Sequence, residues 1–197
     1  MTVKQKQALL LYLGYYVGNV DGDWGQLSKT ATRSFKRSYG LADNTDFDSA
    51  TEKKILSVVA SGEKPKTATT TDPDWKDIRY FQKSEFKCQC GGKYCNGYPE
   101  EIDMVMVGYA DEIRHRLGKP LNVNSGLRCS QWNAIQGGVS NSEHLFGNAC
   151  DLGCPAGTTP AKMAEIAEDV MGGTGGIGIY SWGIHIDSRK TKSRWNG

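Results

Sequence analysis

Apolar residues recur at helical spacing in three segments of the first 60 residues. Residues 4–13, 28–39 and 49–60 each combine this spacing with polar flanks, which predicts three helices. We expect Ser28 to cap the second helix, and Asp48 or Ser49 to cap the third. The side chains expected to face the core are Ala31 and Phe35 in the second helix, and Ile55, Leu56 and Val59 in the third.

The pattern changes after residue 74, where helical and alternating segments follow one another. Residues 100–117 and 161–171 have helical periodicity, and Gly118 and Thr159 supply an end and a start signal. LNVNSGLR predicts a strand that runs into a turn, and GGIGIYSWGIHIDSR alternates like a hairpin. Helices beside a small, mainly antiparallel sheet place this part in the α+β class.

A polar stretch separates the two patterns. SGEKPKTATTTDP, residues 61–73, holds threonine, lysine and proline with nothing to bury, so it predicts a linker. The expected organisation is a three-helix domain over residues 1–60, a linker over 61–73 and a larger domain over 74–197.

Charge and composition exclude several classes of protein. A formal net charge of +2 is too small to predict nucleic-acid binding. No apolar run approaches the roughly 20 residues that span a bilayer, so we expect no membrane association. MTVKQKQALLLYLGYY has helical periodicity and no small-residue cleavage site, so we expect a folded helix rather than a signal peptide. The expected protein is a monomer made in the cytoplasm.

Six cysteines occur, all after residue 87: Cys88, Cys90, Cys95, Cys129, Cys150 and Cys154. The first three form a tight group in FKCQCGGKYC, where a zinc knot is conceivable but the usual two-residue gap between ligands is missing. Buried free thiols and a local bridge are equally compatible with the spacing. Cys150 and Cys154 are expected to be packing residues.

The chain has only three histidines, and one lies in the polar, glycine-bounded stretch NSEHLFGNACDLG. His144, Asp151 and His185 together offer two imidazoles and a carboxylate, a ligand set that suits zinc. Three protein ligands leave one position open, and zinc in such a site can activate water and polarise a carbonyl. The alternative is a hydrogen-bonded structural role for each histidine. His115 lies between two arginines and is expected to be solvated.

Alternation predicts the neighbours of these ligands. On extended segments Ser142 would point the same way as His144, and Asp187 the same way as His185, beside the metal. Glu143 would point away from the site.

The first 60 residues resemble the three-helix peptidoglycan-binding domain found beside many wall hydrolases. The resemblance lies in L-x4-G-x2-DG-x2-G-x4-T-x4-F-x3-YGL, from Leu13 to Leu41. An equally weighted alternative is that these glycines and aspartates only form turns. Tyr15, Tyr16 and Trp24 are candidates for stacking on sugars, or for the core.

Residues 76–197 resemble the zinc D-Ala-D-Ala carboxypeptidases and L-alanyl-D-glutamate endopeptidases, relatives of the hedgehog signalling domain. SEHLFGNACDL, GIGIYSWGIHIDSR and VNSGLRCSQWNAIQGGVSNSEH carry the resemblance. It implies the fold of that family, with His144, Asp151 and His185 as zinc ligands. It also implies that Arg128 grips a substrate carboxylate, with surface ion pairing as the alternative.

The general base is less directly implied. Better-known members carry an acidic residue three positions before the last histidine, where this chain has Trp182. We therefore expect Asp187 to be the base, with orientation of His185 as its alternative role. Ser142 and Tyr180 are expected to line the substrate site, although Tyr180 is also compatible with simple packing.

Together the two resemblances imply zinc-dependent hydrolysis of an amide bond in peptidoglycan stem or cross-link peptides. Without its own export signal, such an enzyme resembles a phage endolysin released through a separate, holin-type membrane lesion. One alternative is a D,D-carboxypeptidase that trims terminal D-Ala. An alternative of another class is a non-catalytic, zinc-stabilised wall-binding protein, which the missing acid at position 182 keeps open.

Overall fold

The computed structural model describes residues 1–16, 18–62 and 75–197. They fall into two compact units, Met1–Asp77 and Ile78–Gly197. Ser61 and Gly62, at the start of the predicted linker, end the third helix, and the rest of that linker lies outside the described residues. Among the residues that the structure describes, no helix is both long and apolar enough to cross a membrane.

The first unit contains the three predicted helices, α1 (Val3–Tyr12), α2 (Gln26–Ser38) and α3 (Ser49–Ser61). Asp48 caps α3, because its carboxylate accepts a hydrogen bond of 2.8 Å from the Thr51 amide. The predicted cap at Ser28 is wrong, since α2 begins two residues earlier behind Gly25.

The core of this unit contains Phe35, which is fully buried and meets Tyr15 edge to face at a centroid distance of 5.5 Å. Tyr15 and Tyr16 are both buried, which favours the core alternative for these two rings, whereas Trp24 is partly exposed. Leu56 is 47% exposed, so its predicted inward position is wrong. Val58, three residues after Ile55, occupies the buried position instead.

A buried amide organises the turn between α1 and α2. Gln7 is fully buried, and its Nε2 lies 2.9 Å from Asp21 Oδ1 and 2.8 Å from the Asp23 carbonyl oxygen. Its Oε1 accepts a hydrogen bond of 2.9 Å from the Gly22 amide. The Asp-Gly segment is therefore held from inside the unit by a side chain that sequence patterning did not single out.

The second unit has the α+β architecture that the sequence predicts. Its helical elements are η2 (Lys83–Phe86), α4 (Met104–Leu117), α5 (Ser130–Ile135), η3 (Glu143–Phe146) and α6 (Pro160–Met171). Its strands are β1 (Val123–Ser125), β2 (Ala149–Gly153), β3 (Gly176–Tyr180), β4 (Gly183–Asp187) and β5 (Ser193–Asn196). They form one sheet in the order β1-β2-β4-β3-β5, antiparallel except for the β3–β5 pair. The short helix α5 and the edge strand β5 were not predicted.

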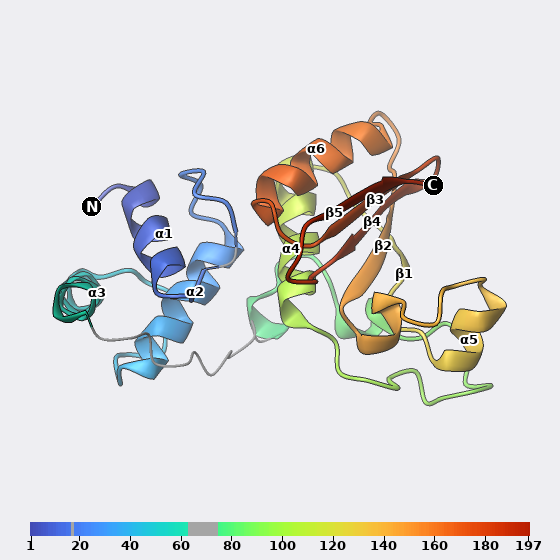
Figure 1. The fold of residues 1–197 in the computed structure, drawn as a ribbon, viewed down its shortest axis with the longest axis horizontal. Coiled ribbons are helices and arrows are strands. Elements are labelled where there is room, and N and C mark those ends of the chain that lie inside the picture. Colours follow the sequence, from blue (N-terminus) through green and yellow to red (C-terminus); the bar gives the residue numbers. More distant parts are fainter. Residues whose placement is uncertain (17, 63–74) are drawn as a thin grey trace. The chain divides into compact units, whose positions relative to one another are not determined.

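The two faces of this sheet have different roles. Helices α4 and α6 contact the sheet on one side (Figure 1). Leu152, Ile184 and Ile186 are fully buried and form the apolar row of β2 and β4. Because side chains alternate along a strand, Asp151, His185 and Asp187 belong to the opposite face. The sheet therefore buries aliphatic side chains on one face and gathers polar groups on the other.

Candidate metal centre

One row of residues crosses all five strands of the sheet and builds the floor of the site. Ser125 pairs with Asp151, Asp151 with His185, His185 with Gly178, and Gly178 with Trp195. Paired residues point to the same face, so the register alone brings Asp151 and His185 together. A slip of either strand by one residue would send its own member of this pair to the helix side.

His144 reaches the same point from a 3-10 turn rather than from an extended segment. The η3 turn ends at Gly147, whose φ of 75° and close approach to the Glu101 carbonyl exclude a side chain. Alternation therefore does not apply here, and the predicted orientations of Ser142 and Glu143 rested on a wrong local conformation. Both residues line the cavity described below.

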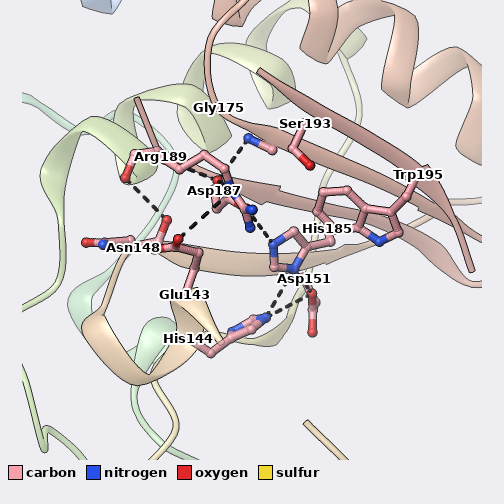
Figure 2. A network of polar contacts seen from close by, with 12 residues as sticks. Glu143, His144, Asn148, Asp151, Gly175, His185, Asp187, Arg189, Ser193 and Trp195 are labelled. Carbon is pink, nitrogen blue, oxygen red and sulfur yellow. Dashed lines mark hydrogen bonds and ion pairs between the residues drawn. The ribbon is translucent and has the colours of Figure 1, made fainter. Parts of the chain in front are cut away.

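The three expected ligand atoms converge. His144 Nε2 lies 3.2 Å from Asp151 Oδ1, His185 Nδ1 lies 2.9 Å from the same oxygen, and the two nitrogens are 3.2 Å apart. All three residues are buried. Figure 2 shows both imidazoles turned towards Asp151, with Asp187 on the far side of the His185 ring.

The outer nitrogens of both rings fix the tautomers. His144 Nδ1 is 2.7 Å from the Gly126 carbonyl oxygen, which only accepts, so Nδ1 carries the proton. His185 Nε2 is 3.2 Å from Asp187 Oδ2 and donates to that carboxylate. In neutral rings, His144 Nε2 and His185 Nδ1 are then lone-pair acceptors that face a third acceptor, Asp151 Oδ1. Such a group is favourable only around a proton or a cation.

The ionisation of the site agrees with this arrangement. Burial alone would raise the pKa of Asp151, but the two imidazoles hold the pKa of this carboxyl well below its ordinary value. Burial opposes protonation of His185, yet its hydrogen bonds to Asp151 and Asp187 raise the pKa of the ring. A divalent cation at this point would satisfy all three acceptors at once.

The spacing fits zinc. Bonds of about 2.0–2.1 Å in a tetrahedral site place the ligand atoms roughly 3.3 Å apart, close to the 2.9–3.2 Å found here. One carboxylate oxygen and two imidazole nitrogens, each ring oriented through its other nitrogen, form the arrangement expected of a catalytic zinc site with one open position.

Asp187 lies behind His185 rather than at the ligand atoms. It is fully buried and binds the Gly176 amide at 2.9 Å and Arg189 through two contacts of 2.7 and 2.6 Å. Burial would raise its pKa, but His185 and Arg189 hold the pKa of this carboxyl well below its ordinary value. This placement suits the alternative role stated above, orientation of the ring, and the general-base role stays a prediction.

Arg128 ties the ligand set to β1. Its Nη2 lies 2.6 Å from Asp151 Oδ2, and its Nε lies 2.8 Å from Ser125 Oγ. The second oxygen of Asp151 is therefore paired, which leaves Oδ1 for the metal. The Arg128 amide also donates to the His144 carbonyl at 3.0 Å, so this residue touches two of the three ligand residues.

A cavity of about 540 Å³ opens over the ligand atoms. Its walls include Arg128, Ser142, Tyr180 and Trp182, together with the three ligand residues. The Tyr180 hydroxyl accepts a hydrogen bond of 2.9 Å from Trp195, and its ring stacks on Trp182 at 4.9 Å. Among the described residues that line the cavity, two carry carboxylates, Asp151 and Glu143.

Two glycines of β3 make room for this site. A Cβ at Gly176 would lie 2.2 Å from Asp187 Oδ2, and one at Gly178 would lie 2.5 Å from the Trp195 ring. With Gly178 in place, the Trp195 ring sits 5.2 Å from the His185 ring. The G-x-G spacing thus has a steric cause, because any side chain would displace Asp187 or Trp195, the neighbours of His185.

Comparison with known proteins identifies the families that the two parts of the chain resemble. Residues 79–187, more than half of the sequence, match the model of the Peptidase M15 family. The chain belongs to the Peptidase M15 family. Residues 2–55 match the model of a putative peptidoglycan binding domain. The zinc D-Ala-D-Ala carboxypeptidase of Streptomyces albus G is 30% identical over 138 residues, which are 68% of this chain. The chain spans about half of that relative, 49% of its length.

The structure adds residues that motif reading missed. The Gly126 carbonyl is invisible in a side-chain pattern, although SG-x-R contains this glycine. Arg189 holds Asp187, and it ends the very motif from which His185 was inferred. Glu143 was considered but expected to point away from the site, whereas it lines the cavity wall.

Gly126→Ala tests the support behind His144. A Cβ at this position would lie 2.3 Å from the Phe86 carbonyl oxygen, so the backbone must shift and carry its own carbonyl away from His144 Nδ1. Loss of such an outer partner costs about 10- to 100-fold in metal affinity. We expect a fall of that size for one metal equivalent, measured by competition with a chromophoric chelator.

Gly173→Ala is the matched control. It adds the same methyl group at a strained φ of 87°, but with no neighbour within 4 Å. We expect some loss of stability and unchanged metal affinity. Equal affinities for the two variants would show that the Gly126 contact does not orient the ligand.

Proposed function

We propose that this protein is a zinc-dependent hydrolase of amide bonds in peptidoglycan stem or cross-link peptides. The supporting observation is the convergence of three lone-pair atoms at the floor of a cavity that an arginine also lines. His144, Asp151 and His185 would hold the zinc, which supplies Lewis acidity towards a carbonyl and lowers the pKa of water.

Arg128 is proposed to bind a carboxylate of the substrate. Its contacts with Asp151 and Ser125 use two of five N–H groups and fix the guanidinium against the cavity. Stem peptides offer carboxylates at chain ends and side chains, and a rigid guanidinium fork matches their geometry. Ser142 and Tyr180 would provide hydroxyl groups along the same wall.

Glu143 is proposed as the proton carrier in place of Asp187. Amide hydrolysis needs a base that takes a proton from the attacking water and returns it to the leaving nitrogen. Glu143 is a cavity-lining carboxylate that is not one of the three ligands, and Asn148 Nδ2 donates to it at 3.1 Å. Arg189 lies 4.0 Å from its other oxygen, so this carboxylate is held by two polar groups.

Glu143→Gln and Asp187→Asn separate the two carboxylates. If Glu143 carries the proton, Glu143→Gln lowers kcat by roughly 10²- to 10⁴-fold while zinc content stays unchanged. Asp187→Asn should instead weaken zinc binding and recover activity when zinc is added in excess. Steady-state kinetics on a soluble stem peptide, together with zinc analysis, distinguish them. Full activity in Glu143→Gln would remove this residue from the mechanism.

The first unit is proposed to attach the enzyme to the wall. Its match to a putative peptidoglycan binding domain and its separate compact fold support this role. Attachment to an insoluble polymer raises the effective concentration of substrate at the site. Two finer versions of this proposal remain. One is action as an endolysin, and the other is action as a D,D-carboxypeptidase, the activity that the name of the Streptomyces albus G relative states.

Digestion of purified sacculi tests the reaction directly. We expect the zinc-loaded chain to release fragments with new amino termini on alanine or glutamate, detected by mass spectrometry. His185→Ala should release none, because it removes one of three ligands. Free D-alanine alone would identify a carboxypeptidase. No product from either protein, with both still bound to sacculi, would favour the non-catalytic alternative.

Sedimentation with sacculi tests the attachment. The fragment Met1–Asp77 should pellet with the wall, whereas Ile78–Gly197 carrying His185→Ala should stay mostly in the supernatant. The full chain carrying His185→Ala serves as the reference, since it binds without degrading the pellet. Equal pelleting by the second unit alone would assign wall affinity to the peptidase domain.

A further inference from the structure

A second group of potential metal ligands lies outside the proposed active site. The thiols of Cys88, Cys90, Cys95 and Cys129, here called the cysteine cluster, all lie within 4.8 Å of one another. Three come from the loop after η2, and Cys129 caps the start of α5. We propose that the cysteine cluster holds a second zinc ion, with a structural role.

The distances favour a shared metal. Zn–S bonds of about 2.3 Å place the sulfurs of a tetrahedral site roughly 3.8 Å apart. Cys90 Sγ and Cys95 Sγ are 3.5 Å apart, far beyond the length of about 2.05 Å of a disulfide bond. Four thiols gathered into one group, rather than drawn into two bonded pairs, match the Cys₄ ligand set of structural zinc sites.

Backbone amides point at the sulfurs. The Cys129 amide donates to Cys88 Sγ at 3.3 Å, and the Gly97 amide donates to Cys95 Sγ at 3.4 Å. Hydrogen bonds of this kind stabilise the negative charge of a thiolate and orient it towards a metal. They therefore provide the outer support that a thiolate zinc site requires.

The loop that carries Cys88, Cys90 and Cys95 has few buried side chains besides the thiols. In the segment from Lys87 to Gly97, all of which is described, the only buried side chains are those of Cys88 and Cys90. Gly91, Gly92 and Gly97 have φ values between 66° and 97° and turn the chain around the sulfurs. A segment without an apolar core gains its folding free energy from the metal in known structural zinc sites.

The cysteine cluster lies next to the residues that support the proposed active site. Cys129 follows Arg128 directly, and the Leu127 amide donates to the Phe86 carbonyl at 2.8 Å. The same short stretch provides the Gly126 carbonyl that orients His144. Zinc at the cysteine cluster would clamp the loop to the stretch that positions Arg128 and a ligand of the other metal.

Zinc stoichiometry of the full chain tests the proposal without reference to hydrolysis. We expect two zinc ions per chain by mass spectrometric metal analysis, and one in Cys95→Ser, Cys129→Ser and His185→Ala. Cys154→Ser is the matched control and should retain two, because this thiol lies outside the cysteine cluster. Cys129→His, which supplies another zinc ligand, should also retain two and guards against simple misfolding.

Two further readouts decide between metal and disulfides. Cobalt bound to thiolates gives intense charge-transfer absorption, which we expect in the wild-type chain and in His185→Ala but not in Cys129→Ser. Alkylation after denaturation with chelator should modify all six cysteines. One zinc per chain, no thiolate absorption, or fewer than six alkylated cysteines would each overturn the proposal. Two zinc ions without hydrolysis of sacculi would uphold it and reject only the proposed function.

Discussion

Three electron-rich atoms held within about 3 Å of one another are the constraint on which the second unit depends. His144 Nε2, Asp151 Oδ1 and His185 Nδ1 repel one another unless a cation lies among them. The fold keeps them together by occupying every other polar atom of these side chains. Gly126 and Asp187 hold the outer nitrogens, and Arg128 holds the second oxygen. The polar groups around the site thus hold these three atoms in the arrangement that a bound cation would need.

The sheet positions these atoms through its strand register and through the space that its small residues leave. The row from Ser125 to Trp195 contains one residue from each strand, and each contributes to the site. Gly178 lies between His185 and Trp195 because only a hydrogen fits beneath the indole ring. On the other face, the same strands bury isoleucine and leucine against α4 and α6. The apolar face fixes the register, and the register places the ligands.

Sequence reasoning succeeded where periodicity decides the structure. The helices, the hairpin and the shared face of His185 and Asp187 follow from spacing alone. Sequence reasoning failed where a contact between distant segments determines the local structure. Alternation could not orient Ser142 or Glu143, because η3 is a 3-10 turn fixed by the approach of Gly147 to Glu101. Nor could it decide between the two roles considered for Asp187, or reveal that Cys129 joins three cysteines more than 30 residues earlier.

The charges around the cavity connect the site to the chemistry of its proposed substrate. Asp187 and Arg189 neutralise each other behind His185, and Arg128 compensates Asp151. A divalent cation at the ligand atoms would then be opposed, within the cavity wall, by Glu143 alone. The cavity would carry net positive charge, which attracts anionic peptides and lowers the energy of negative charge that develops on a carbonyl oxygen. Trp182 adds no charge to this wall, so the positive field is reduced there only by Glu143, the carboxylate proposed above to carry the proton.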